Sequence, residues 1–239
     1  DALVACDLPR ECIQYVDIAD RAATDALMQL HGLVDVLIPR GGAGLIEHCV
    51  QNSKVPVIET GTGNCHVYVH DSADPQMAKD IVLNSKCRRL GVCNACETLL
   101  LDDGVADDAA ADMMTALVDR GITLHADERA YDLASRAGIS GEALLHATEE
   151  DWGTEYLGPE ISVKYVSGVD DAIKHVNKYG TKHSESIVSS DEDAAEEFLK
   201  RVDAAAVYHN AATAFTDGGQ FGLGAEIGIS TQKLHARGP

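Results

Sequence analysis

Short apolar runs typical of β-strands alternate with helical patterns along most of this 239-residue chain, and this alternation constrains the fold more than any other feature. A strand that leads through a helix to another strand usually forms a parallel pair with the helix on one face of the sheet. We therefore predict an α/β fold with a mostly parallel sheet flanked by helices. Strands are predicted at residues 34–38, 55–58, 67–69, 97–101, 161–166 and 206–208.

Helices are predicted between these strands from apolar spacing and from capping residues. Asp74 followed by Pro75 is typical of an N-cap with proline at the first helical position. Ser190 with Asp193 resembles a capping box. The helical faces are predicted within residues 45–50, 77–85, 110–117, 172–176 and 194–199.

The composition favours a helix-on-sheet core and disfavours two kinds of partner. Hydrophobic residues make up 45% of the chain but aromatic residues only 5%, so Ala, Val, Ile and Leu must fill the core. The formal net charge is -20, which disfavours nucleic acid and anionic membranes as partners. The acidic run over residues 102–112 is interpreted as a solvated loop and helix start.

The chain shows no sign of a membrane protein or of a disulfide scaffold. No apolar run approaches the ~20 residues of a membrane span, and no signal peptide is recognised. Seven cysteines, an odd number in a chain of this size, fit reduced thiols in a cytoplasmic protein. The sequence also lacks an initiator Met and begins in a helix-like pattern, so we expect a piece of a longer protein.

The densest group of reactive residues is the run from Gly91 to Glu97, predicted to form a turn between a helix and a strand. Cys93 in this turn is a candidate nucleophile, because a thiolate near cationic groups such as Arg88 and Arg89 is reactive at neutral pH. Cys93 and Cys96 also spell C-x-x-C, which is compatible with a dithiol pair, half a zinc site or two structural cysteines. The ten histidines are scattered and supply no matching ligand pair, so we predict no metal.

Four other segments are candidates for ligand contact, each with an ordinary structural alternative. The glycines of residues 38–44 would let backbone N–H groups approach a phosphate at a helix N-terminus, or would form a simple tight turn. Glu59 follows a predicted strand, where open α/β sheets place ligands, but a solvated carboxylate fits equally. The other two segments are a turn at residues 155–160 and a glycine-rich loop at residues 217–228.

Read in order, these segments resemble one family, gamma-glutamyl phosphate reductase, within the aldehyde dehydrogenase superfamily. The resemblance covers nearly the whole chain. Its most specific parts are the His-Ser-Glu of residues 183–185 and the run from Gln232 to Pro239. It also includes Ile38-Pro-Arg-Gly-Gly, Pro56-Val-Ile-Glu-Thr-Gly-Thr-Gly-Asn-Cys-His-Val-Tyr-Val, Val92-Cys-Asn-Ala-Cys-Glu-Thr-Leu-Leu, Tyr179-Gly-Thr-Lys-His-Ser-Glu-Ser-Ile and the glycine-rich run from Phe215.

The resemblance implies an aldehyde-dehydrogenase-like fold and an NADPH-dependent oxidoreductase of proline biosynthesis. Cys93 would attack L-glutamyl 5-phosphate, expel phosphate and form a thioacyl enzyme, and hydride from NADPH would then give L-glutamate 5-semialdehyde. The backbone N–H of Cys93 is a candidate oxyanion donor. By the same resemblance, Glu59 occupies the general-base position, Glu155 holds the nicotinamide ribose, Gly41, Gly42 and Gly61 lie near the cofactor, and Asn94 and Asn210 contact substrate.

The resemblance also implies a division of the chain and shows where the chain departs from the family. Residues 1–58 would be the C-terminal part of the cofactor-binding domain, residues 59–225 the catalytic domain, and residues 226–239 a return segment toward the cofactor domain. Family members extend beyond both ends of this sequence. Ala214 stands where the family usually has Arg, which would remove an anion contact. Cys96 stands where a small non-reactive residue is expected, which disfavours a dithiol function.

Relatives assemble as oligomers, so we expect a homo-oligomer, with glutamate 5-kinase as a possible protein partner. Three alternatives stay open at this point. The chain would be the reductase half of a fused pyrroline-5-carboxylate synthase, a catalytically incomplete fragment that only packs with partner subunits, or a metal or redox protein built on Cys93 and Cys96.

Overall fold

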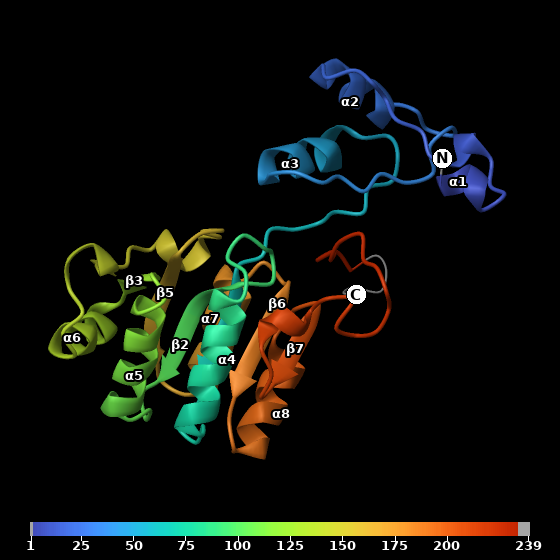
Figure 1. Ribbon diagram of the computed structural model, residues 1–239. Coiled ribbons are helices and arrows are strands. Elements are labelled where there is room, and N and C mark those ends of the chain that lie inside the picture. The colour runs from blue at the N-terminus through green and yellow to red at the C-terminus, as the bar shows by residue number, and fades with distance from the viewer. Residues whose placement is uncertain (1, 234–239) are drawn as a thin grey trace. The chain divides into compact units, whose positions relative to one another are not determined.

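The computed structural model describes residues 2–233, which fall into two compact units, Asp1–Ile58 and Glu59–Pro239 (Figure 1). Each unit is described by itself. The predicted functions of residues 1–58, 59–225 and 226–239 stay predictions, and residues 234–239 of the last segment lie outside the described part.

The Asp1–Ile58 unit contains helices but no strand within its described residues. Its elements are α1 (Ala2–Ala5), the 3₁₀ turn η1 (Arg10–Cys12), α2 (Arg21–Met28) and α3 (Ala43–Asn52), and α3 confirms the helix predicted at 45–50. The strands predicted at 34–38 and 55–58 are wrong. The two segments share one isolated parallel bridge, Leu37 with Val57, held by two hydrogen bonds of 2.8 Å. Val34 makes a second isolated bridge, to His31, and neither bridge extends into a ladder.

The Glu59–Pro239 unit is built on a seven-stranded sheet in which every pair of neighbouring strands is parallel, so the α/β prediction is confirmed. The strand order is β4-β3-β5-β2-β1-β6-β7. The strands are β1 (Cys65–Val69), β2 (Cys96–Asp102), β3 (Thr123–Ala126), β4 (Leu144–His146), β5 (Glu160–Val166), β6 (Ser184–Val188) and β7 (Ala206–His209).

Four of these strands confirm predicted ones, β1, β2, β5 and β7, whereas β3, β4 and β6 were not predicted. β6 escaped prediction because it begins with Ser184, Glu185 and Ser186, which read as a surface segment. All five of its residues are nevertheless buried, and Ser184 and Ser186 donate hydrogen bonds to Thr216 Oγ1 and to the Ala211 carbonyl, each over 2.7 Å. Such pairing removes most of the cost of burying a hydroxyl.

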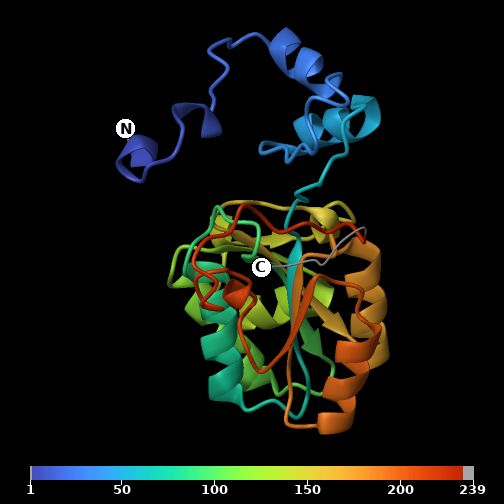
Figure 2. The same ribbon diagram turned by 90° about the vertical axis from the view of Figure 1, so that its right-hand side faces the viewer.

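Helices cover both faces of this sheet. α4 (Pro75–Cys87), α5 (Asp107–Val118) and α6 (Glu128–Arg136) pack on one face, and α7 (Val169–Tyr179) and α8 (Glu192–Arg201) pack on the other (Figure 2). Short 3₁₀ turns occur at η2 (Gly141–Ala143), η3 (Asp151–Gly153) and η4 (Thr213–Phe215).

Two predicted helix caps had different outcomes. The Asp74 side chain accepts a hydrogen bond from the Met77 N–H over 2.8 Å, which confirms the N-cap of α4. The capping box at Ser190 is wrong, because Asp191 caps α8 instead. Its carboxylate accepts from the N–H groups of Asp193 and Ala194 at 2.9 and 3.1 Å.

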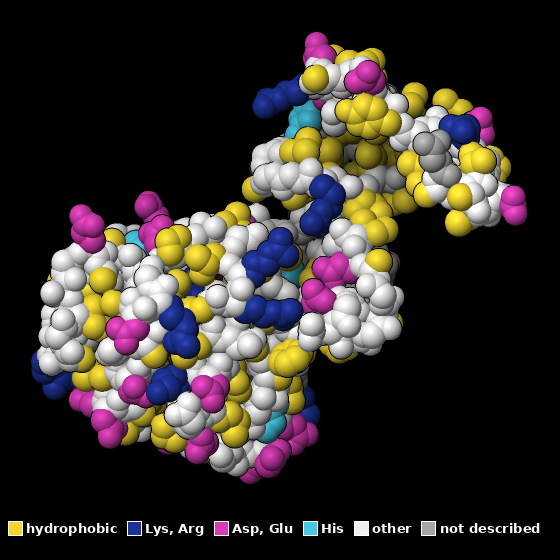
Figure 3. Space-filling model, viewed as in Figure 1, with side chains coloured by type: hydrophobic (Ala, Val, Ile, Leu, Met, Phe, Trp, Pro, Cys, Tyr) yellow, Lys and Arg dark blue, Asp and Glu magenta, His cyan; other side chains and the backbone are white. Residues whose placement is uncertain are grey.

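The surface of the Glu59–Pro239 unit mixes acidic and basic side chains on the face shown in Figure 3. The acidic run after β2 is in part exposed as predicted, and α5 begins at Asp107. Asp102 is the exception, because it is buried and accepts a 2.5 Å hydrogen bond from the Tyr68 hydroxyl. No helix within residues 2–233 has the length and apolar character needed to cross a membrane.

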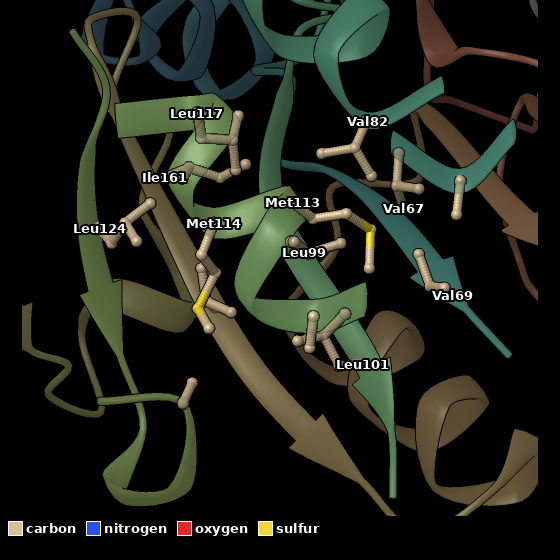
Figure 4. Packing of buried hydrophobic residues seen from close by; sticks show 14 of the residues in the cluster. Val67, Val69, Val82, Leu99, Leu101, Met113, Met114, Leu117, Leu124 and Ile161 are labelled. Carbon is tan, nitrogen blue, oxygen red and sulfur yellow. The ribbon is translucent and has the colours of Figure 1, made fainter. Parts of the chain in front are cut away.

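Alternate side chains along each strand point to opposite faces of the sheet and form two hydrophobic clusters, one on each face. Val67, Val69, Leu99 and Leu101 point toward α4 and α5 and pack with Met113 and other buried residues (Figure 4). The residues between them, Tyr68 and Leu100, join the second cluster with Phe198 of α8 on the opposite face. The sheet is therefore buried on both faces, as parallel sheets are.

Candidate active site

Cys93 lies in the turn between the end of α4 and the start of β2, as the sequence predicted. The turn is closed by a hydrogen bond of 3.1 Å from the Ala95 N–H to the Val92 carbonyl, and Cys93 is partly exposed. A helix and a strand flank the turn, an arrangement that can hold a reactive side chain in place.

Cys96 has a different environment from Cys93, although only two residues separate them. Cys96 is the first residue of β2, and it is buried, with its thiol donating to the Thr98 carbonyl over 3.3 Å. Burial raises the pKa of the Cys96 thiol to about 12, so this sulfur stays protonated and unreactive. Within residues 2–233 no cluster of three or more His, Cys, Asp or Glu side chains has the geometry to hold a metal ion.

The segment of Glu59 to Asn64 packs directly against the Cys93 turn. A Cβ atom at Gly63 would lie 1.6 Å from the Cys93 carbonyl oxygen, so only glycine fits at this position. A Cβ at Gly61 would lie 2.8 Å from Thr231 Oγ1. These two close approaches explain the glycines of this segment as packing requirements, whatever ligand lies nearby.

Glu155 reaches the same place from the turn before β5. Its Oε1 atom accepts a hydrogen bond from the Gly63 N–H over 2.5 Å. The structure therefore brings Glu155, Gly63 and Cys93 together, although 92 residues separate Glu155 from Gly63. Glu59 lies at the start of the same segment, partly buried, and its N–H donates to Gln232 Oε1 over 2.9 Å.

Asn94 ties the Cys93 turn to the segment around η4. Its Nδ2 donates to the carbonyls of Thr216 at 2.9 Å and Ala214 at 3.5 Å, and its own carbonyl accepts from Thr213 Oγ1 at 2.7 Å. Arg88 Nη1 also donates to the Ala214 carbonyl, over 3.4 Å. Position 214 thus lies beside Asn94, and the side chain of Arg88 places a guanidinium there.

Asn210 lies at the other end of the sheet. It follows the last residue of β7, with a φ of 55°, a conformation that Asn tolerates better than most residues. Its side chain exchanges two hydrogen bonds of 3.0 Å with the backbone of Ser189, just after β6. These contacts give Asn210 a structural task, and the geometry does not bring it to Cys93.

The gathered site residues lie at the amino-terminal edge of the sheet, not at the carboxyl edge that the general rule for α/β sheets favours. Gly63, Cys93 and Leu157 come shortly before β1, β2 and β5, and His183 comes directly before β6. Glu59 follows the segment 55–58, which is not a strand, so the prediction that Glu59 lies at the carboxyl end of a strand is wrong.

Three polar groups at this edge were given no role from the sequence, although Glu97 and His183 belong to segments named there. Lys86 and Glu97 form an ion pair of 2.5 Å in which both side chains are fully buried. Burial raises the pKa of Glu97 to about 7, against the opposing effect of the Lys86 ammonium. His183 is fully buried, and desolvation lowers its pKa to about 4. A usable signal existed for Lys86, because it falls on the apolar face of α4, one turn after Val82.

Gly41 and Gly42 belong to the Asp1–Ile58 unit. Gly42 is the N-cap of α3 and makes no side-chain cap, and apart from its chain neighbours no residue of the described part comes within 4 Å of where its Cβ would be. The first N–H groups of a helix are a favourable place for an anionic group, and phosphate contact at this ten-residue helix stays a prediction. A Cβ at Gly41 would lie 2.8 Å from Leu45 Cδ2.

Comparison with known proteins gives consistent matches. The family model of the aldehyde dehydrogenase family matches residues 145–225. A gamma-glutamyl phosphate reductase of Bifidobacterium adolescentis is 51% identical over all 239 residues, and these cover 56% of that protein. The crystal structure of gamma-glutamyl phosphate reductase from Thermotoga maritima superimposes with a TM-score of 0.92 at 43% identity, covering 100% of this chain and 56% of that one.

A more distant structure shares the fold alone. An acetylating aldehyde dehydrogenase from Geobacillus thermoglucosidasius has a TM-score of 0.74 at 21% identity, covering 100% of this chain and 60% of that one. The chain thus has an aldehyde-dehydrogenase-like fold, and it spans about half the length of the curated relatives it matches.

Proposed function

This chain is homologous along its entire length to gamma-glutamyl phosphate reductases, within the aldehyde dehydrogenase superfamily, and from this we propose that the protein containing it is an NADPH-dependent oxidoreductase of proline biosynthesis. It would convert L-glutamyl 5-phosphate into L-glutamate 5-semialdehyde and phosphate. The observation that carries the proposal is the packing of the Cys93 turn against Gly63, whose N–H donates to the Glu155 carboxylate.

Cys93 is the nucleophile in this proposal. Its thiolate forms a bond to the acyl carbon of the acyl phosphate, the carbon–oxygen bond to phosphate breaks, and phosphate leaves with the electron pair. The backbone N–H of Cys93 lies next to the sulfur and is the candidate donor to the developing oxyanion. After reduction of the thioester carbon, the carbon–sulfur bond breaks, the aldehyde is released and the thiolate is regenerated.

Candidate residues for binding a nicotinamide cofactor occur in each unit taken by itself. The open N-terminus of α3 at Gly42 suits a phosphate group, and Gly41 precedes it. In the second unit the Glu155 carboxylate is a charged acceptor for ribose hydroxyls beside the Cys93 turn, and Gly61 lies in the segment that packs there. When bound, NADPH supplies the hydride that reduces the thioester.

The roles of three nearby side chains follow from their positions. Asn94 uses its amide N–H groups to hold the Cys93 turn against Thr216, so its substrate contact is limited to its Oδ1 and backbone. Arg88 is exposed beside Ala214 and supplies a cation for an anionic substrate where the family's Arg is missing. Glu59 has no required role in the reductive direction, because no water is activated.

A homo-oligomer, a contact with glutamate 5-kinase and a cytoplasmic location belong to the same proposal.

The test is the Cys93→Ser variant of the full-length protein. NADP⁺-dependent oxidation of glutamate 5-semialdehyde in the presence of phosphate, the reverse reaction, is followed by absorbance of NADPH. We expect the rate to fall by at least about 10³-fold, since a hydroxyl is far less nucleophilic than a thiolate. Cys96→Ser is the matched control, and it keeps the activity because its thiol is buried and protonated. Wild-type rates in Cys93→Ser would refute the proposed nucleophile.

A further inference from the structure

Lys86 and Glu97 form a fully buried ion pair that the chemistry above does not use. Neither side chain has any exposed surface, and Nζ lies 2.5 Å from Oε2. Taking two charges out of water is costly, and well-packed apolar residues of similar size usually stabilise a fold as well or better. Fold stability is therefore a weak reason for this pair to exist, and its position suggests another.

The pair encloses the Cys93 turn. Lys86 lies in the last turn of α4 and Glu97 is the second residue of β2, so the ion pair joins the two ends of the segment that carries Cys93. The segment between the end of α4 at Cys87 and the start of β2 at Cys96 has no regular secondary structure. An ionic contact across this segment fixes the distance that the turn must span.

The same carboxylate also holds the Glu155 turn. Oε1 of Glu97, the atom not used by Lys86, accepts a hydrogen bond from the Leu157 N–H over 3.2 Å. Leu157 has a φ of 52°, a strained backbone conformation for a leucine that persists only where the surroundings hold it. Two residues earlier, the side chain of Glu155 accepts a hydrogen bond from the Gly63 N–H through its Oε1 atom.

We propose that the buried Glu97 side chain is a positioning group that sets the Cys93 turn and the Glu155 turn relative to each other through its Oε1 atom, which anchors the Leu157 N–H. Lys86 pairs with the other oxygen and compensates the buried charge of Glu97. Neither residue touches the reacting atoms. The inference rests on the proposed function, because it assigns the two positioned groups to thiol chemistry and to cofactor binding.

The decisive comparison uses two double variants of the full-length protein that both remove the buried charges. Lys86→Met with Glu97→Gln keeps an oxygen that accepts from the Leu157 N–H, whereas Lys86→Met with Glu97→Leu removes it. Thermal unfolding establishes that both variants are folded. NADPH affinity by fluorescence titration and the rate of Cys93 alkylation by iodoacetamide, mapped by mass spectrometry, are then measured against wild type.

We expect the Glu97→Leu double variant to bind NADPH at least tenfold more weakly and to change the Cys93 alkylation rate by threefold or more. The Glu97→Gln double variant should stay within about threefold of wild type in affinity, although both have lost the ion pair. Equal behaviour of two folded double variants, in both assays, would overturn the inference, since a purely structural pair would not distinguish the lost acceptor.

A measurement on the wild-type protein covers the case in which a variant does not fold. Hydrogen exchange of the Leu157 amide should be slowed at least 100-fold relative to an unstructured peptide, and fast exchange at Leu157 would overturn the anchoring role. Absence of NADPH binding in the wild type would instead count against the proposed function, while the exchange and alkylation results would still test the positioning.

Discussion

In the Glu59–Pro239 unit two layers of helices cover a seven-stranded sheet, whereas the described part of the Asp1–Ile58 unit has helices and two isolated bridges, His31 with Val34 and Leu37 with Val57. The Asp1–Ile58 unit also leaves large apolar side chains at its surface, with Tyr15, Leu33 and Ile13 exposed to 86%, 81% and 72%. Its buried hydrophobic residues are Met28, Ile46, Cys49 and Val55, while the other unit buries most of its strand residues completely.

The difference shows what a strand-like sequence needs before it becomes a strand. Residues 34–38 and 65–69 are similarly apolar, but only the second segment has a parallel partner on each side, β2 and β6. Hydrogen bonding along a ladder, and helices on both faces, supply the stability that a short apolar run lacks by itself. The sequence pattern was thus equally suggestive in both units and correct in one.

The largest expected effect is a difference in the cost of removing an apolar side chain from each unit. Leu101→Ala leaves a cavity in the buried cluster under α4 and α5, so we expect a loss of about 2–5 kcal/mol in the free energy of unfolding. Leu33→Ala in the other unit should change it by less than about 0.5 kcal/mol, because the side chain is exposed. Urea unfolding of both variants measures this, and equal costs would break the comparison.

The second effect is a pH dependence from a buried histidine at the amino-terminal edge of the sheet. His183 stays neutral in the fold down to its pKa of about 4, while in the unfolded chain a histidine gains a proton below about 6.5. The unfolded state thus binds more protons between these values, and the fold loses stability as the pH falls.

The His183→Gln variant isolates this contribution. Between pH 6.5 and pH 4 we expect the stability of wild type relative to the variant to fall by on the order of 3 kcal/mol, about 1.4 per pH unit. Unfolding in urea at several pH values provides the measurement, with His146→Gln as control because that side chain is largely exposed. A pH-independent difference would mean that His183 is protonated in the fold.

Gly41 and Gly42 are the cofactor-binding residues predicted in the Asp1–Ile58 unit, and Gly42→Asp tests this prediction. The substitution meets no steric obstacle, and Asp is a good N-cap, so α3 should remain intact. Its negative charge would occupy the place of a phosphate, and we expect at least about tenfold weaker NADPH binding, or 1.4 kcal/mol. Gly42→Ser, which caps the helix without charge, is the control. Unchanged affinity in Gly42→Asp would exclude this helix from the cofactor site.

Glu155→Gln tests the second unit and is expected to have the smallest effect. A neutral amide is a weaker acceptor than a carboxylate for ribose hydroxyls, so NADPH affinity should fall by about three- to tenfold. Titration of full-length protein measures it, and Glu150→Gln, an exposed carboxylate at the 3₁₀ turn before the loop, serves as control. Equal effects in the two variants would remove Glu155 from the cofactor site.

Part of the candidate site was evident in the sequence because its chemistry is local. Cys93 lies in a turn between a helix and a strand that were both predicted. The pairing of Gly63 with the Cys93 carbonyl and with Glu155 was not predictable from spacing, because it joins segments that are distant along the chain. Asn210 is the opposite case. It lies only four positions from Ala214 in the sequence, but at the end of the sheet away from Cys93.

The sequence by itself determined the α/β class, most helices and most long strands, because apolar periodicity and capping residues act over a few neighbouring positions. Only the tertiary structure decided which strand-like segments pair and that the polar segment Ser184–Val188 is a strand with neighbours on both sides. It also decided that Lys86 and Glu97 form a fully buried ion pair. Those outcomes depend on burial and on partners far away in sequence, which no local pattern encodes.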